Sequence, residues 1–284
     1  MIVPHLEGRT LTKGHGAGND FILVPDFDAA IDISADDVAA VCDRHKGIGA
    51  DGLIRVVRTE ALARREGIAV DDPSVEWFMD YRNADGSVAE MCGNGVRVFV
   101  HYLRIQGIIS LAAGQSVAVA TRGGTKRVSF DGTLYTVDMG PYELGGRVSV
   151  EIPNVGTREG CAVAMPNPHV VVRVSEEELA AADFHRPPVY DPHPIHGTNL
   201  ELVSPGGVAH MRVLERGVGE TLACGTGTCA VAVALRASDG SGDGQVEIES
   251  PGGHLSVRLA DGRAYLTGPA VLVAEFSLLG IAGL

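Results

Sequence analysis

Two short segments place a cysteine directly before a glycine-rich turn and an apolar helix. The first reads Cys92-Gly-Asn-Gly95 and the second reads Cys224-Gly-Thr-Gly227. At a helix start, the free backbone N–H groups and the helix dipole favour a thiolate over a thiol. The glycines keep side chains away, so the same N–H groups can bind an anion such as a carboxylate. Each segment therefore predicts a reactive thiol beside a carboxylate-binding turn.

A structural interpretation of both cysteines stays open. Cysteine is among the most buried residue types, and the two residues could also form a disulfide with each other. We interpret the three remaining cysteines, Cys42, Cys161 and Cys229, as structural. Cys229 follows Cys224 by five positions on the same helix, so its side chain points elsewhere.

Two such thiols could invert a stereocentre if they flanked one carbon atom. Inversion by proton transfer needs a base on one face and an acid on the other, so one sulfur is a thiolate and the other a thiol. The thiol pKa of about 8.5, lowered by a helix start, suits both roles near neutral pH. The N–H groups of the turns would hold a substrate carboxylate and stabilise the charge that spreads onto it.

The elements around the two cysteines look like copies of one another. A strand precedes each glycine-containing loop, at Trp77–Arg82 and at His210–Glu215, and a helix apolar on most sides follows. A helix of that kind belongs in the centre of a domain. The two copies lie nearly half the chain apart, far beyond the period of a solenoid. They indicate two similar domains, with a change of domain near 140–141.

The rest of the chain consists mostly of short strand candidates separated by turn residues, which favours an α+β fold. These candidates are 52–57, 116–120, 126–130, 134–138, 170–174, 245–249, 255–259 and 271–275. We expect irregular structure at 71–74 and at the proline-rich 185–194, and a flexible loop at 238–244.

Composition limits the classes of function. The chain of 284 residues carries 23 Lys and Arg against 36 Asp and Glu, a formal charge of −13. This balance argues against a nucleic-acid partner or an anionic membrane surface. No signal peptide or membrane-spanning stretch is recognisable, and the odd count of five cysteines argues against a disulfide scaffold. We expect a cytoplasmic protein.

No cofactor motif is convincing. The segment Gly47-Ile-Gly-Ala-Asp-Gly52 matches a dinucleotide pattern, but a helix precedes it and a strand follows, the reverse of the required order. No phosphate-binding loop occurs, and none of the three lysines lies in a pyridoxal-phosphate motif. The pair His193 and His196 lies in a proline-rich loop, a poor zinc spacing. We expect no nucleotide, pyridoxal phosphate or metal.

Five blocks of sequence, in order, resemble the diaminopimelate epimerase family over nearly the whole chain. They are 13–21 (KGHGAGNDF), 83–95 (NADGS followed by MCGNG), 167–169 (NPH), 199–201 (NLE) and 215–227 (ERGVGETLACGTG). The related proline racemases typically carry His where Asn94 stands. The resemblance implies an enzyme without cofactors that interconverts LL- and meso-diaminopimelate for lysine and peptidoglycan precursor synthesis, and a homodimer.

The resemblance also implies an architecture and a set of site residues. Two pseudo-symmetric domains, 1–140 with 269–284 returning to it and 141–268, would each curl a mostly antiparallel sheet around a central helix, with the active site in the cleft between them. Cys92 and Cys224 match the acid/base pair, and His169 and Glu215 match positions that tune the thiols. The matching substrate contacts are Asn19, Asn83, Gly93, Asn94, Asn167, Asn199, Glu215, Arg216, Gly225 and Thr226.

Three features depart from the family pattern. Gly52 stands where many members carry a substrate-binding Gln, Ala274 stands where an aromatic residue is linked to dimerisation, and 60–74 looks longer than usual. Because of Gly52, a racemase that acts on another amino acid with the same fold remains an alternative function. A non-catalytic thiol–disulfide sensor or binding protein is a further alternative.

Overall fold

The computed structural model describes residues 5–279, so the last five positions of the segment 269–284 lie outside the described residues. The chain forms two compact units, Met1–Val137 with Pro269–Leu284, and Asp138–Gly268. Strands dominate both units and each contains one long helix, which confirms the α+β class. Within residues 5–279, no helix has the length and apolar character needed to cross a membrane.

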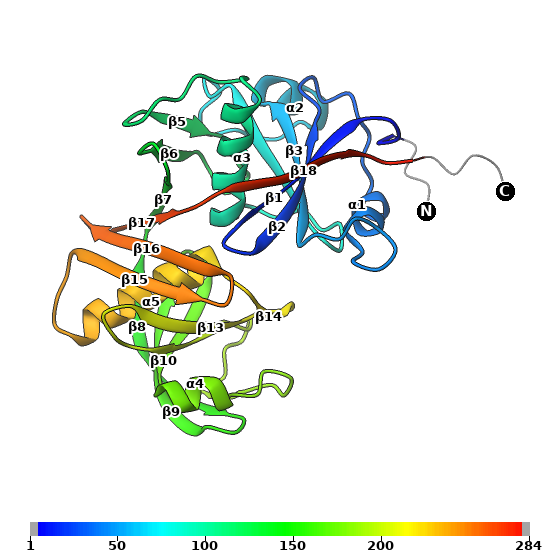
Figure 1. Ribbon diagram of the computed structural model, residues 1–284. Coiled ribbons are helices and arrows are strands. Elements are labelled where there is room, and N and C mark those ends of the chain that lie inside the picture. The colour runs from blue at the N-terminus through cyan, green and yellow to red at the C-terminus, as the bar shows by residue number, and fades with distance from the viewer. Residues whose placement is uncertain (1–4, 280–284) are drawn as a thin grey trace. The chain divides into compact units, whose positions relative to one another are not determined.

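The first unit is organised by a five-stranded sheet in the order β18-β1-β2-β3-β4. Its strands are β1 (Thr10–Gly16), β2 (Asn19–Pro25), β3 (Gly52–Arg58), β4 (Trp77–Asn83) and β18 (Val271–Ser277). Only β2 and β3 run parallel, and the other neighbours are antiparallel. β18 comes from the far end of the chain and forms the edge of the sheet beside β1 (Figure 1).

The long helix of this unit, α3 (Gly93–Ile105), packs against the sheet and touches each of its five strands (Figure 1). Ten of its side chains or glycines are buried, including Val96, Phe99 and Leu103. This confirms the prediction of a central helix that is apolar on most sides. The antiparallel strands β5 (Ser116–Val119), β6 (Lys126–Phe130) and the start of β7 (Tyr135–Pro141) complete the unit.

Two shorter helices cover the first unit. α1 (Ala35–Cys42) begins at a capping box in which Ser34 and Asp37 bond each other's backbone N–H groups. The chain then connects α1 to β3, so Gly47–Gly52 joins a helix to a strand, as its context predicted. α2 (Thr59–Glu66) covers the first part of the segment 60–74, and 71–74 has no regular structure, as expected.

A buried ionic cluster attaches α2 to the sheet. Arg55, which is 2% exposed, contacts Asp26 at 3.0 Å, Glu66 at 3.2 Å and Asp80 at 3.3 Å. Arg122 also contacts Glu66 and Asp80. A buried charge is tolerated only when it is paired, so these residues hold the segment onto the outer face of β3 and β4.

The second unit curls one sheet around its own long helix, α5 (Gly225–Ser238). The strand order is β11-β8-β9-β10-β12-β13-β15-β16-β17, with β14 beside β13. The strands are β8 (Glu143–Ile152), β9 (Gly156–Ala164), β10 (Pro168–Arg173), β11 (Val189–Asp191), β12 (Asn199–Ser204), β13 (Ala209–Glu215), β14 (Gly219–Thr221), β15 (Gly244–Ser250), β16 (Gly253–Ala260) and β17 (Arg263–Gly268). Because α5 contacts β9 and β10 as well as β16 and β17, the sheet wraps around it.

Most neighbours in this sheet are antiparallel, as predicted, with parallel pairs at β10–β12 and β13–β15. The face of β10 and β12 that points away from α5 packs against the short helix α4 (Glu176–Ala181), through residues such as Leu179, Leu200 and Leu202. The chain between α5 and β15 is a loop, in agreement with the prediction for 238–244.

One detail of the predicted secondary structure was wrong. The proline-rich segment 185–194 is not irregular throughout, because β11 (Val189–Asp191) pairs with β8 from Ser149 to Glu151. Prolines flank this short strand at both ends and stand outside its ladder, and β11 is the edge of the sheet. An edge position tolerates nearby proline, which explains why composition alone was misleading here.

Candidate active site

Cys92 occupies the N-cap position of α3. Its backbone is extended, and its Sγ accepts a hydrogen bond from the Gly95 N–H at 3.4 Å. The side chain is partly exposed, whereas Asn94 two residues further on is fully buried. The predicted helix start at this cysteine is therefore present, with backbone N–H groups directed at the sulfur.

Asn19, at the start of β2, joins Cys92 to the rest of its unit. The Asn19 Oδ1 accepts from the Cys92 thiol and from the Asn94 amide, both at 3.4 Å. Its Nδ2 donates to the Asp51 carboxylate at 2.7 Å, which fixes the direction in which the amide points. Asn94 is held in turn by the Arg97 guanidinium at 2.9 Å. The structure thus brings together Asn19, Cys92, Gly93 and Asn94 of the predicted site.

Charged residues outside the predicted site hold Asp51, the hydrogen-bond acceptor of Asn19, in place. Asp51 also contacts Arg44, and Arg44 and Lys13 both contact Asp20. Burial alone would raise the pKa of Asp20, but its hydrogen bonds to Arg44 and Lys13 lower that pKa to about 2. The Asp20 carboxylate therefore stays ionised and holds these cations beside the loop that carries Asp51.

Asn83 has a local partner rather than a link to Cys92. Its Nδ2 donates to the Ser87 hydroxyl at 3.0 Å, and its backbone N–H bonds the Ser87 carbonyl oxygen. It ends β4 opposite Gly52, the position of the missing Gln. A Cβ atom at Gly52 would lie 2.4 Å from the Arg82 carbonyl oxygen and 2.6 Å from the Tyr81 ring, so a side chain there would force one of them to shift.

Cys224 occupies the N-cap position of α5 with the same extended backbone as Cys92, but it is buried. Its Sγ lies 3.5 Å from the Thr226 hydroxyl. Burial and the negative charges of Glu215 and Glu201 raise the pKa of Cys224, while the Thr226 hydroxyl and the Gly227 N–H oppose that rise. A thiolate on this sulfur consequently depends on the donors that surround it.

A row of polar side chains leads from Thr226 into the sheet. The Asn167 Nδ2 donates to the Thr226 Oγ1 at 3.3 Å, and the Asn167 Oδ1 lies 3.1 Å from the His169 Nε2. The other ring nitrogen of His169 lies 2.6 Å from a carboxylate oxygen of Glu201, and both side chains are fully buried. The structure therefore brings together Asn167, His169, Gly225 and Thr226 of the predicted site on the side of Cys224.

Asn199 and Arg216 form a neighbouring pair. The Asn199 Oδ1 accepts from the Arg216 backbone N–H at 2.9 Å, and its Nδ2 donates to the Pro168 carbonyl oxygen at 3.1 Å. Arg216 reaches the His196 carbonyl oxygen at 2.9 Å, and Glu215 accepts from Thr221. Asn199 thus fixes the loop that presents Arg216, with both ends of its amide bonded to backbone.

Three supporting residues escaped the sequence prediction: Asp51, Arg97 and Glu201. Two of them carried a weak signal, since Arg97 is a charge within an apolar helix and Glu201 is a charge within the apolar strand β12. Their buried partners become visible only in the folded chain.

The other cysteines fit their structural interpretation. Burial raises the pKa of Cys42 to about 12 and also raises that of Cys161, and Cys229 is fully buried in α5. Among residues 5–279, no group of three or more His, Cys, Asp or Glu side chains is arranged to hold a metal ion.

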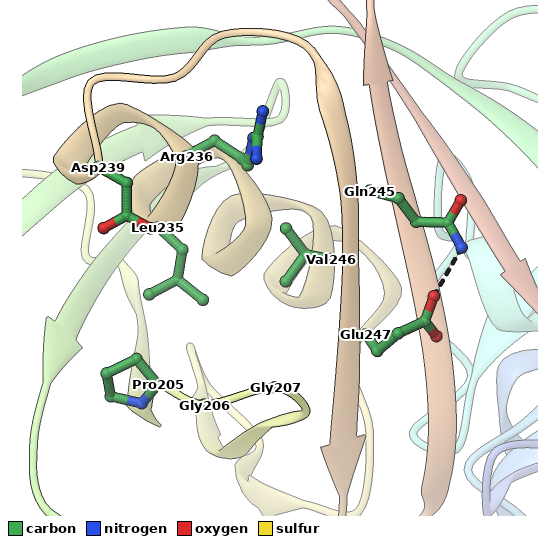
Figure 2. A pocket seen from close by; sticks show the side chains of 9 residues that line it. All are labelled: Pro205, Gly206, Gly207, Leu235, Arg236, Asp239, Gln245, Val246 and Glu247. Carbon is green, nitrogen blue, oxygen red and sulfur yellow. Dashed lines mark hydrogen bonds between the residues drawn. The ribbon is translucent and has the colours of Figure 1, made fainter.

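A pocket of about 340 Å³ lies in the second unit but away from these residues. Figure 2 shows its lining, from the C-terminal end of α5 (Leu235, Arg236, Asp239), the turn at 205–207 and β15. Cys224 caps the opposite end of α5, about 20 Å away at 1.5 Å per helical residue. None of the predicted site residues lines this pocket, so it is separate from the predicted site.

Solved structures share this fold. A predicted epimerase from Pseudomonas aeruginosa matches 96% of this chain and 99% of its own with a TM-score of 0.69 at 15% identity. A phenazine biosynthesis protein of the PhzF family from Bacillus anthracis matches 95% of this chain and 98% of its own with a TM-score of 0.68 at 14% identity. These identities show the fold alone, and with the helix-capping cysteines they place the chain in a class of two-domain α+β proteins.

Sequence comparison gives the family. The family model described as diaminopimelate epimerase matches residues 11–145 and 161–273. The diaminopimelate epimerase of Streptomyces coelicolor is 47% identical over 279 residues (93% of each chain), and that of Rhodococcus opacus is 45% identical over 285 residues (94% of this chain, 96% of the relative). The chain belongs to the diaminopimelate epimerase family and is an isomerase, which confirms the resemblance.

Proposed function

We propose that this chain interconverts LL- and meso-diaminopimelate by proton transfer between two cysteines, in lysine and peptidoglycan precursor synthesis. The observation that carries the proposal is the pair of cysteine-capped helix starts, one in each compact unit, in a chain of this family. The two units would be the two domains, 1–140 with 269–284, and 141–268.

The mechanism follows from the chemistry of the two helix starts. One sulfur, as thiolate, removes the α-hydrogen as a proton, and the electron pair that remains spreads into the substrate carboxylate. The other sulfur, as thiol, delivers a proton to the opposite face of the same carbon, which inverts its configuration. Cys92 and Cys224 exchange these roles when the substrate of opposite configuration reacts.

The N–H groups at the helix starts are the proposed binding site for that carboxylate. Gly93 and Asn94 begin α3, and Gly225 and Thr226 begin α5, so each pair presents free N–H groups beside its cysteine. These donors stabilise the charge that develops in the transition state. His169 and Glu215, which lie near Cys224, would tune its protonation.

The remaining predicted contacts would recognise the distal amino acid head of diaminopimelate. Arg216 carries a guanidinium, which pairs with a carboxylate through two parallel hydrogen bonds, and Glu215 offers a carboxylate for an ammonium group. Asn199 orders the backbone of this loop. Asn19 and Asn83 would add amide contacts from the first unit.

Deuterium exchange tests this function directly. Reduced protein is incubated in D2O with LL-diaminopimelate, and α-deuterium incorporation and stereochemistry are followed. We expect exchange together with formation of the meso isomer. The absence of exchange in the fully reduced protein would refute the epimerase.

A racemase for another amino acid is the second candidate, because one observation favours it. Position 52 has Gly where the family resemblance expects a substrate-binding Gln, and its surroundings would have to shift to admit that side chain. Exchange in the same assay with a different amino acid, and none with diaminopimelate, would favour the racemase.

We further propose a cytoplasmic homodimer. The odd count of five cysteines argues against a disulfide scaffold, which suits a reducing compartment. The edge strand β18 exposes Val271 (40%) and Val273 (59%), and Ala274 beside them is also exposed. Light scattering should give the mass of two chains for the wild type, and Val273→Glu should give the mass of one. A monomeric wild type would contradict the dimer.

A further inference from the structure

Glu201 is a buried carboxylate beside the proposed base Cys224, and the proton-transfer mechanism gives it no task. It lies in β12 on the face that points toward α5. The parallel register of β10 and β12 pairs His169 with Asn199, which places Glu201 next to His169 on that face. Both side chains have 0% exposure, and the Glu201 Oε1 lies 2.6 Å from the His169 Nδ1.

Both ring nitrogens of His169 have a hydrogen-bond partner. Nδ1 faces the Glu201 carboxylate and Nε2 faces the Asn167 Oδ1, so both ring nitrogens face acceptor oxygens. The Asn167 Oδ1 is available as an acceptor because its Nδ2 donates to Thr226. A ring that donates from both nitrogens is an imidazolium, and a buried imidazolium requires a paired anion.

Hydrogen bonds lead on from His169 to the Cys224 sulfur, and each donor in this series points toward the sulfur. Thr226 Oγ1 accepts from Asn167, so its own hydrogen is left for the Cys224 Sγ at 3.5 Å. The series Glu201, His169, Asn167, Thr226 therefore ends with a donor at the sulfur. Burial and the nearby carboxylates raise the pKa of Cys224, so donors of this kind are what a thiolate there requires.

The first unit contains no counterpart of Glu201 at the matching glycine. A Cβ at Gly227 would lie 2.5 Å from the Glu201 Oε1, whereas a Cβ at Gly95 would meet Ile54 at 3.3 Å. The second glycine of the Cys224 turn is thus required by the carboxylate, and the two thiols have different surroundings.

We propose that Glu201 is a positioning residue for epimerisation: it holds His169 doubly protonated, so that Asn167 and Thr226 direct their donors at Cys224. This inference rests on the proposed function. The negative charge of Glu201 sets the protonation of the ring, and the ring sets the direction of the remaining bonds.

The kinetic test replaces the charge without changing the shape. Glu201→Gln should lower kcat about 10- to 100-fold, the range that a misplaced catalytic group produces, and change KM less than about threefold, because the lost interaction acts on the transition state. Glu176→Gln is the matched control, since Glu176 holds the exposed His210 at 2.8 Å in the same unit. The control should leave both constants unchanged.

A double-mutant cycle separates positioning from general stabilisation. If Glu201 acts through His169, Glu201→Gln should lower kcat no further in a His169→Gln background. If the reductions in kcat from the two substitutions multiply, Glu201 acts independently of His169 and the proposal is wrong. A kcat within twofold of the wild type in Glu201→Gln would also overturn the proposal.

A third measurement is made on the wild-type protein without substrate, and a variant is needed only to assign one resonance. In ¹⁵N-histidine-labelled wild-type protein, NMR should show both ring nitrogens of His169 protonated, with the resonance assigned by its loss in His169→Gln. A neutral ring with an unprotonated Nδ1 would overturn the proposal even in an active enzyme. Conversely, a wild type without epimerase activity would refute the function while this spectrum still tests the Glu201–His169 pair.

Discussion

The packing around Gly52 predicts the effect of restoring the family residue. In Gly52→Gln, the new Cβ would stand 2.4 Å from the Arg82 carbonyl oxygen and 2.6 Å from the Tyr81 ring, far inside van der Waals contact. The backbone oxygen belongs to the β3–β4 ladder and cannot move alone. Either the two strands separate or the Tyr81 ring is displaced, and both changes disturb the core.

The magnitude follows from the contacts that are lost. Overpacking of this kind costs about 1–3 kcal/mol. Displacing Tyr81 also breaks its edge-to-face contact with Phe21, at 5.7 Å between centroids, which adds about 0.5–1.5 kcal/mol. A total of about 2–4 kcal/mol corresponds to a fall in Tm of about 5–15 °C.

Thermal unfolding followed by circular dichroism measures this change. Gly146→Gln is the control, because Gly146 in β8 has no atom within 4 Å of an added Cβ and its φ is not positive. The control should melt with the wild type. If Gly52→Gln were as stable as Gly146→Gln, the close packing at position 52 and the reasoning built on it would be refuted.

Three further results are expected. Cys92→Ala and Cys224→Ala should each abolish epimerisation in a stereochemical assay, and wild-type turnover in either variant would show that its thiol is neither acid nor base. Asp51→Asn weakens the acceptor of Asn19 and should lower kcat by about tenfold or more through misorientation of that amide; an unchanged kcat would contradict this role. The lowered pKa of Asp20 contributes stability that is present above about pH 4 and is lost as pH falls toward about 2. Asp20→Asn should therefore lower Tm at pH 6 but less at pH 3, and a constant difference between the two proteins would contradict the ion pairs.

The sequence predicted the helix starts because the relevant physics is local. A cysteine followed by two closely spaced glycines and an apolar run defines an N-cap, a turn and a buried helix within a few residues, and both Cys92 and Cys224 occupy those positions. Several strands, such as β3, β6 and β16, were predictable for the same reason, since short apolar runs between turn residues are local patterns. Other strands were not among the predicted candidates, including β1, β2, β8, β9, β12, β14 and β17.

Contacts between distant segments could not be predicted in this way. Glu201 reads as one charge in an apolar strand, and only the parallel pairing of β10 with β12 gives it His169 as a partner. In the sequence, Gly52 indicates only that a substrate-binding side chain is missing. The fold shows that Tyr81 and Arg82 lie close around this position. β11 was missed because its partner strand β8 lies 40 residues earlier in the chain.

The position of β18 at the end of the sequence also constrains when the first unit can finish folding. Its edge strand is synthesised after the whole of the second unit, yet it pairs with β1 and supplies the Pro269 carbonyl oxygen that accepts from Arg97 in α3. Until that segment leaves the ribosome, β1 has an open edge and the helix behind Cys92 lacks a neighbour. The second unit needs no segment beyond Gly268, so only the Cys92 half depends on the last strand of the chain.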